Sequence, residues 1–215
     1  MPLGPVVYTE EVSKMGVPIR KADRHYTYRD YREWPEGERW ELIDGVAYDM
    51  SPAPSVNHQR LVPRLWAQID LQLRGTPCEA LTAPVDVFLP ADPGAAEDDV
   101  DTVVQPDVLV VCDRSRIRPN GIWGPPDLVI EITSPWTAKK DLAEKFDVYE
   151  RAGVREYWVV DPGNRSVVVY PLEPPAQGPA RYGSGRVYAE PGKVLSAAVL
   201  GVEVDFAEAF ASLSS

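Results

Sequence analysis

The chain has 215 residues, of which 44% are hydrophobic. It is therefore long enough to form the hydrophobic core of one large domain, and too long for a small protein that depends on disulfides for its stability. Its 33 Asp and Glu outnumber 22 Lys and Arg, and the net charge of −11 argues against binding nucleic acid through bulk positive charge. No apolar stretch of about 18 residues and no secretory pattern occur, so we expect neither a transmembrane helix nor a signal peptide.

The chain begins with residues 1–25, which show no periodicity and predict a loose arm before a single domain over 26–215. A short helix over 28–34 should end at Pro35. Asp44-Gly45 separates two strand-like runs, 39–43 and 46–50, and predicts a β-hairpin. Glu41 then lies on the face opposite Trp40, where it is either a metal ligand or an exposed strand carboxylate.

A helix is predicted over 58–74, with Ser55 as its N-cap and Gly75 at its end. His58 shares the apolar face of this helix. It is either a core histidine bonded to a backbone carbonyl or a residue that supports a site near Glu41. Pro63 breaks the rule for helix interiors, so the helix either begins near Arg60 or bends at Pro63.

Five strands are predicted over 83–89, 102–113, 127–133, 155–161 and 165–170. The apolar runs 108–112 and 128–132 are typical of central strands covered on both faces. A helix over 137–151 suggests a βαβ crossover, and residues 161–164 form the turn of a second hairpin. Residues 171–185 should be an exposed loop, and 205–212 a closing helix. The fold class is therefore α/β, with a mixed β-sheet flanked by helices.

Two cysteines, Cys78 and Cys112, make no disulfide framework and no CxxC motif. We expect both to be small hydrophobic side chains in a reducing compartment, which favours a cytoplasmic location.

Two acidic residues stand in or beside apolar strands, where a carboxylate is costly without a partner. Asp107 opens one strand and Glu131 lies inside another, and their spacing allows two neighbouring strands to bring them side by side. Such oxygen ligands suit Mg²⁺ or Mn²⁺ better than Zn²⁺. The alternatives are that Asp107 bonds a backbone amide at a strand start and that Glu131 pairs with an arginine.

Lys145 lies on the flank of the buried stripe of the 137–151 helix and can point toward the sheet end that carries Glu131. An ion pair between the two would keep both side chains charged. The lysine could stabilise a developing phosphorane charge, or it could be a lysine whose stem covers apolar surface.

The chain resembles a widespread bacterial family of restriction-endonuclease-like proteins within the PD-(D/E)XK nuclease superfamily. Several motifs carry this resemblance, in the right order over about residues 25–171: Glu41-Leu-Ile-Asp-Gly45, Met50-Ser-Pro, His58-Gln59, Val104-Gln-Pro-Asp-Val-Leu-Val110, Pro126-Asp-Leu-Val-Ile-Glu131, Ser134-Pro135, Asp141 with Lys145, and Gly153-Val-Arg-Glu-Tyr-Trp-Val-Val-Asp-Pro162. The resemblance implies a mixed sheet flanked by helices and divalent-metal hydrolysis of phosphodiesters. Pro106-Asp107 matches the PD element and Glu131 the (D/E) position, but Thr133 stands where the lysine is expected, so Lys145 would supply the cation.

The resulting hypothesis is a Mg²⁺-dependent endonuclease, with Mn²⁺ as a substitute, acting on DNA rather than RNA as a homodimer. Asp107, Glu131 and Glu41 would hold the metal, Lys145 would stabilise the transition state, and His58 and Thr133 would support the ligands. The cations expected to contact nucleic acid are Arg60, Arg64, Arg114, Arg116, Lys139 and Lys140. The alternative is a catalytically degenerate nuclease-fold protein that serves as a binding or scaffold module.

Overall fold

The computed structural model describes residues 24–35, 37–50, 54–92, 94–133, 140–174, 177–189, 192–211 and 213, with the backbone alone for 140–142. The predicted arm over 1–25 lies almost wholly outside the described residues, as do Lys139 and the side chain of Lys140. Among the described residues, no helix is both long enough and apolar enough to cross a membrane.

The larger sheet has seven strands in the order β12-β11-β10-β9-β6-β3, with β13 also paired to β11. Its strands are β3 (Glu79–Thr82), β6 (Val108–Val111), β9 (Leu128–Ile132), β10 (Glu156–Asp161), β11 (Ser166–Glu173), β12 (Arg181–Tyr182) and β13 (Arg186–Ala189). The pair β9–β10 is parallel, with α3 (Lys140–Ala152) between them in the chain, while the other pairs are antiparallel. The predicted βαβ unit and the hairpin after it are therefore confirmed.

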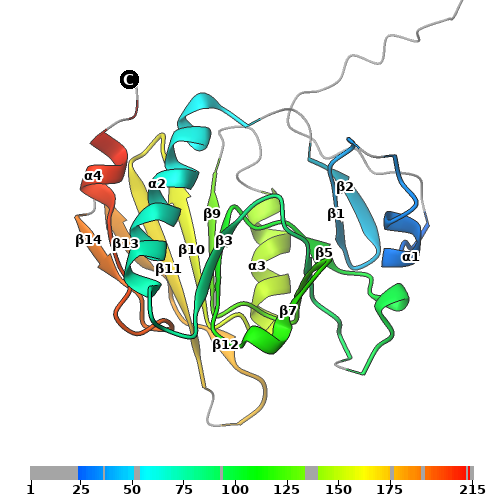
Figure 1. Cartoon of the computed structure of the whole chain (residues 1–215). Helices are drawn as coiled ribbons and strands as arrows, with labels where there is room; N and C mark the ends of the chain where they lie inside the picture. The colour runs from blue at the N-terminus through cyan, green and yellow to red at the C-terminus, as the bar shows by residue number, and fades with distance from the viewer. Residues whose placement is uncertain are drawn as a thin grey trace, which may run out of the picture.

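Helices cover both faces of this sheet (Figure 1). Alternate residues of β6 separate into two cores: Val108 and Val110 pack with α2 (Val56–Leu73) and α4 (Phe206–Ala211), while Leu109 and Val111 pack with α3. This explains the continuous apolar runs in the central strands, because neither face meets water.

A second sheet of six strands has the order β2-β1-β5-β4-β8-β7. Its strands are β1 (Trp40–Ile43), β2 (Val46–Asp49), β4 (Val87–Phe88), β5 (Val103–Val104), β7 (Ile117–Arg118) and β8 (Gly121–Trp123). The β1–β2 hairpin turns at Asp44 (φ 51°) and Gly45 (φ 72°), the positive φ values for which this dipeptide is suited. The remaining short elements are α1 (Tyr28–Tyr31), η1 (Glu97–Asp99), η2 (Arg114–Arg116), and the β14 (Lys193–Leu195) and β15 (Glu203–Asp205) pair.

Helix α2 begins at Val56, where the Ser55 hydroxyl accepts a hydrogen bond from the His58 amide at 3.2 Å, so the predicted N-cap is confirmed. The helix continues through Pro63, and a start near Arg60 is wrong. The missing proline N–H leaves a carbonyl one turn earlier without its usual donor. Pro63 lies on the exposed face, where water can bond that carbonyl.

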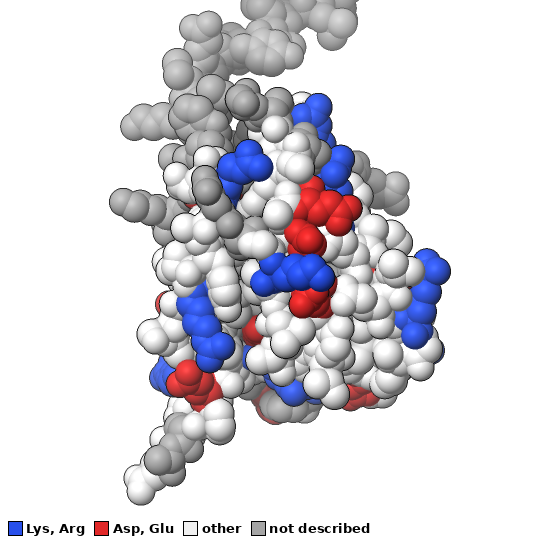
Figure 2. Space-filling view, turned by 90° about the vertical axis from the view of Figure 1, so that its left-hand side faces the viewer, with Lys and Arg blue, Asp and Glu red and all other residues white. Residues whose placement is uncertain are grey.

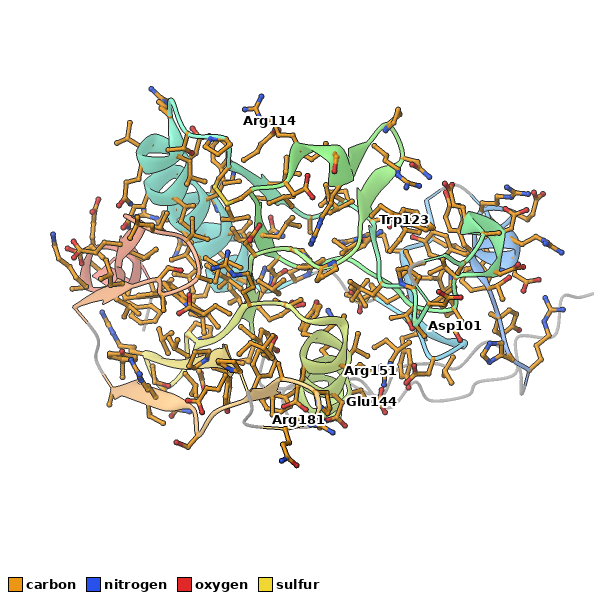
Figure 3. All side chains as sticks on the ribbon, turned by 90° about the horizontal axis from the view of Figure 1, so that it is seen from below. Asp101, Arg114, Trp123, Glu144, Arg151 and Arg181 are labelled. Carbon is orange, nitrogen blue, oxygen red and sulfur yellow. A yellow bond between two sulfur atoms is a disulfide. The ribbon has the colours of Figure 1, made fainter. Side chains whose placement is uncertain are left out.

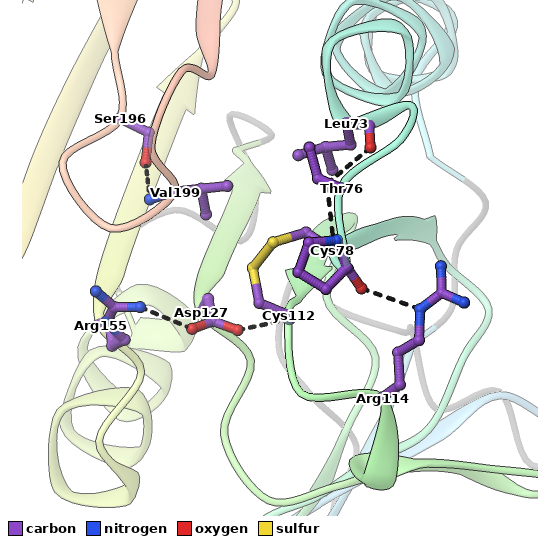
Figure 4. Close-up of a disulfide and its surroundings, with 10 residues drawn as sticks. Leu73, Thr76, Cys78, Cys112, Arg114, Asp127, Arg155, Ser196 and Val199 are labelled. Atoms are coloured by element: carbon purple, nitrogen blue, oxygen red, sulfur yellow. Dashed lines mark hydrogen bonds and ion pairs between the residues drawn. A yellow bond between two sulfur atoms is a disulfide. The ribbon is translucent and has the colours of Figure 1, made fainter.

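Cys78 and Cys112 form a disulfide, so the expectation of two free hydrophobic thiols is wrong (Figure 4). Glu79 pairs with Val111 across β3 and β6, which places the two cysteines opposite each other just beyond the ladder. Neither a sequence motif nor the spacing of the two cysteines predicts this disulfide, because the pairing of β3 with β6 is what brings them together.

Two other expectations need correction. The predicted strand over 102–113 is divided into β5 and β6 at Pro106, which has no N–H to donate to a ladder. The predicted exposed loop over 171–185 instead contains the end of β11 and all of β12. Tyr182 in β12 is buried against Phe146 and Tyr170, and this aromatic contact holds the segment on the sheet.

Candidate functional site

Asp107 lies at the start of β6, where its carboxylate meets the end of β9. Val108 pairs with Ile130 in the antiparallel β6–β9 ladder, so one residue further along the ladder Asp107 is opposite Glu131. The Ile132 amide donates to Asp107 Oδ2 at 2.8 Å, and His58 Nε2 donates to the same oxygen at 2.9 Å. The backbone bond expected of a strand-start aspartate is therefore present, and it fixes the carboxylate beside Glu131.

Lys145 of α3 lies between two carboxylates. Its Nζ is 3.0 Å from Glu131 Oε1 and 2.9 Å from Glu41 Oε1. The side chains of Lys145, Glu131 and Glu41 are 9%, 10% and 3% exposed. The expected inward direction of Lys145 and its ion pair with Glu131 are confirmed, whereas Glu41 is buried and is not an exposed strand carboxylate.

Two further donors hold these carboxylates and were not anticipated. The Tyr149 hydroxyl donates to Glu131 Oε1 at 2.7 Å, and the Gln105 amide donates to Glu41 Oε1 at 2.7 Å. Tyr149 follows Lys145 by four residues, so both reach the sheet from one side of α3. That spacing was a usable signal for Tyr149, but a backbone amide such as that of Gln105 leaves none in the sequence.

Burial raises the pKa of Glu131 to about 7, although Lys145 acts in the opposite direction. The negative charges of Asp107 and Glu41 raise it further. Pairing with Lys145 therefore favours the ionised form of Glu131, as expected, but desolvation has the larger effect on its pKa. Burial by itself would lower the pKa of Lys145, but Glu131 and Glu41 together raise it above its ordinary value, so the lysine stays charged.

His58 lies on the buried face of α2, as predicted, but its partner is Asp107 and not Glu41. The N-terminal turn of α2 reaches the end of the sheet at which β6 starts, which places the ring beside Asp107. Its Nδ1 is buried without a hydrogen-bond partner among the described residues. Thr133 is buried at the end of β9, and its amide donates to the Val160 carbonyl at 2.8 Å.

The chemistry of the paired carboxylates fits a hard divalent cation. Among the described residues, no donor reaches Asp107 Oδ1 or Glu131 Oε2, and within this part of the chain these are the two oxygens that would bind a cation. Within the same part of the chain, no three or more His, Cys, Asp or Glu side chains form a metal-binding group. The structure therefore presents two ligands together, with Glu41 joined to Glu131 through Lys145.

The predicted nucleic-acid contacts are dispersed. Arg60 and Arg64 are exposed on the N-terminal half of α2, the half that carries His58. Arg114 and Arg116 follow the end of β6 that is opposite to Asp107, so the length of the strand separates them from that carboxylate. They are also engaged there: Arg114 Nε donates to the Pro77 carbonyl at 3.0 Å, and Arg116 lies 3.4 Å from Asp113.

Figures 2 and 3 show how charged side chains are spread over the molecule. In Figure 3, Arg114 and Arg181, which is not among the predicted contacts, lie at opposite sides of the molecule. On the described part of the face in Figure 2, basic and acidic side chains lie beside one another with neutral surface around them, and no continuous basic stripe crosses it.

A family model named Uma2, described as a putative restriction endonuclease, matches residues 28–207. The chain belongs to the Uma2 family. A solved structure described as a putative nuclease belonging to DUF820 from Anabaena variabilis ATCC 29413 is similar, with a TM-score of 0.66 at 21% identity. The match covers 86% of this chain and 97% of that one. No curated protein sequence matches the chain.

The Uma2 assignment confirms the restriction-endonuclease-like resemblance, and the solved structure confirms the mixed α/β fold. The match covers nearly all of the solved chain, so the similarity of fold extends over almost the whole of that structure.

Proposed function

We propose that this Uma2 protein is a divalent-metal-dependent endonuclease that hydrolyses phosphodiester bonds, with DNA as its substrate. The observation that carries the proposal is the position of Asp107 opposite Glu131 on adjacent strands, with the Lys145 ammonium 3.0 Å from Glu131. Paired carboxylates beside one buried cation are what phosphodiester hydrolysis needs: ligands for a metal ion and a positive charge for the transition state.

Each side chain has a role in this proposal. Asp107 and Glu131 would hold Mg²⁺ or Mn²⁺, and Glu41 would join them as a third ligand once Lys145 moves away from it. A divalent cation bound there supplies a Lewis acid next to the phosphate. Lys145 would then donate to a phosphate oxygen as negative charge develops on it. His58 orients Asp107 through Oδ2, and Tyr149 orients Glu131 through Oε1.

The proposed approach of DNA uses local cations, because the chain as a whole carries a net charge of −11. Arg60 and Arg64 are the best supported of them, since they project from the half of α2 that holds His58. Lys139 and Lys140 precede Lys145 in the chain and remain candidates. A homodimer would let two such sites cut both strands of a duplex, and light scattering after gel filtration measures that assembly.

The direct test is cleavage of supercoiled plasmid and of a single-stranded oligonucleotide, with Mg²⁺, Mn²⁺ or EDTA. The wild-type protein should cut only with metal, and Glu131→Gln should lower the rate by about 10²-fold or more. Glu173→Gln, at an exposed position at the end of β11, is the matched control and should cut normally. Cleavage that persists in EDTA, or in Glu131→Gln at the wild-type rate, would overturn the proposal.

The second candidate is a nuclease-fold protein that binds without turnover. It is favoured by the lack of a three-residue metal group among the described residues and by Thr133 at the expected lysine position. A rise in melting temperature with Mn²⁺ but no cleavage of any nucleic acid would support it.

A further inference from the structure

A pocket of about 340 Å³ opens beside the second sheet, apart from the carboxylates described above. Its lining is mixed and more polar than apolar: Leu81, Val85, Ile117 and Ile122 line it together with Asp86, Gln105, Arg118 and Asn120. This volume lies at the lower end of the range of small-molecule sites, roughly 300–1,000 Å³. The pocket thus combines aliphatic side chains with charged and amide groups, which suits a ligand that has both an apolar face and a hydrogen-bonding edge.

Asp86 is a partly buried carboxylate with neutral partners. The Tyr31 hydroxyl and the Gln105 amide nitrogen both donate to Oδ1, at 3.0 and 2.8 Å. Among the described residues no Lys, Arg or His pairs with Asp86, and Oδ2 has no donor there. Burial raises the pKa of Asp86, while the two hydrogen bonds act against this shift. An acceptor oxygen beside a cavity, uncompensated by a cation within the described part of the chain, is a feature that a donor-bearing ligand would satisfy.

Gln105 connects this pocket to the candidate nuclease site. Gln105 lines the pocket and its side-chain amide donates to Asp86, while its backbone amide holds Glu41 Oε1 at 2.7 Å. The Ala83 amide, next to the pocket-lining Pro84, donates to the Asp107 carbonyl at 3.2 Å. The pocket therefore adjoins the candidate nuclease site at two places. Gln105 connects it to Glu41, and Ala83, the neighbour of Pro84, connects it to Asp107.

A cation stands at another edge of the pocket. The Arg118 guanidinium lies 4.2 Å from the centroid of the Trp123 ring and 3.7 Å from Glu97 Oε2, and its side chain is 42% exposed. The cation–π contact with Trp123 positions the guanidinium without using all of its N–H donors. Arg118 can thus contact a phosphate while the attached base enters the pocket.

We propose that this pocket binds a guanine base of a single-stranded or extrahelical nucleotide, with Asp86 accepting from its Watson–Crick edge. Guanine presents two adjacent donors there, N1–H and the 2-amino group. In adenine and cytosine the amino group is instead flanked by a ring nitrogen that would repel a carboxylate, and thymine offers one N–H between two carbonyls. Pockets for unstacked bases usually combine apolar side chains against the base with hydrogen bonds to its edge, and the aliphatic residues and Asp86 of this pocket supply both kinds of contact.

This assignment deepens the proposed nuclease function, since the pocket would select the nucleotide next to the cleaved bond. Base binding itself needs no metal, however, and can be measured in EDTA. The probe is a labelled seven-nucleotide oligothymidylate with one central guanine, followed by fluorescence anisotropy with the full chain. Companion probes carry thymine, adenine, cytosine or hypoxanthine at the centre, and hypoxanthine lacks only the 2-amino group.

The guanine probe should bind about tenfold more tightly than the thymine probe, the scale of one good base contact, and hypoxanthine should lose most of that gain. Asp86→Asn should abolish the preference, while the exposed control Asp147→Asn should retain it. Equal binding of all five probes by the wild-type protein would overturn the proposal, as would a preference that survives Asp86→Asn.

The hypoxanthine comparison uses unaltered protein, so the proposal stays testable even if Asp86→Asn fails to fold. Cleavage without guanine preference would remove this inference and leave the nuclease intact. Guanine preference without cleavage would support this inference and count against the proposed nuclease function.

Discussion

Replacing Lys145 with methionine removes the cation between Glu41 and Glu131 and keeps most of the side-chain volume. All three side chains are at most one-tenth exposed, so water cannot replace the lost charge. Breaking a buried ion pair from one side typically costs about 3–5 kcal/mol of unfolding free energy. For a protein of this length that corresponds to a fall in melting temperature of roughly 6–20 °C.

The loss should depend on pH. The pKa of Glu131 is already raised to about 7 in the folded protein, from 4.5, and losing Lys145 raises it further. At a pH between the pKa of Glu131 in the unfolded state and its pKa in the folded state, the folded protein binds a proton that the unfolded chain does not. The unfolding free energy therefore rises as pH falls through this range. Protonation removes one of the two uncompensated charges. We therefore expect the full 3–5 kcal/mol near pH 8 and roughly half of it or less near pH 5.5.

Urea unfolding followed by tryptophan fluorescence at pH 8 and pH 5.5, in EDTA, measures both values. Lys193→Met is the matched control, because Lys193 pairs with Glu203 at 2.7 Å on the exposed surface and should show no measurable change. A Lys145→Met protein as stable as this control at pH 8, or one with equal losses at both pH values, would refute the reasoning.

Other outcomes follow from the same contacts. Lys145→Met should also slow plasmid cleavage by about 10²-fold, with poor rescue by arginine, and an unchanged rate would exclude Lys145 from the chemistry. Because a proton competes with a cation for Glu131, Mn²⁺ affinity measured by calorimetry should rise with pH and level off above about 7, whereas a flat profile would contradict the raised pKa. His58→Ala should weaken Mn²⁺ binding roughly 10- to 100-fold, and unchanged affinity with unchanged melting temperature would show that the ring is dispensable. Reducing the Cys78–Cys112 disulfide, whose cysteines are 34 residues apart, should lower the unfolding free energy by about 2–4 kcal/mol, and identical urea midpoints with and without dithiothreitol would count against this.

The central strands and the Asp44-Gly45 hairpin could be predicted from the sequence because their signals are local. Apolar runs, turn residues and helical periodicity each depend on neighbours in the chain. The direction of Lys145 was also predictable, since a helical wheel needs only the spacing within one helix.

The missed features depend on pairing between distant segments. The Cys78–Cys112 bond requires the β3–β6 register. The partner of His58 depends on where the N-terminal turn of α2 packs against the sheet. The raised pKa of Glu131 depends on how much surrounding chain excludes water. None of these quantities is encoded within a window of ten or twenty residues.

The path between the two strands that hold Asp107 and Glu131 has a consequence for how this protein can diversify. After β6 the chain leaves the larger sheet, forms β7 and β8 in the other sheet, and returns as β9. This excursion supplies Ile117, Arg118 and Ile122 to the pocket, while the β6–β9 ladder keeps the two carboxylates in register. If the proposed functions hold, exchanging the excursion between relatives would alter which nucleotide is preferred without realigning the carboxylates, so nucleotide selectivity and hydrolysis would evolve separately.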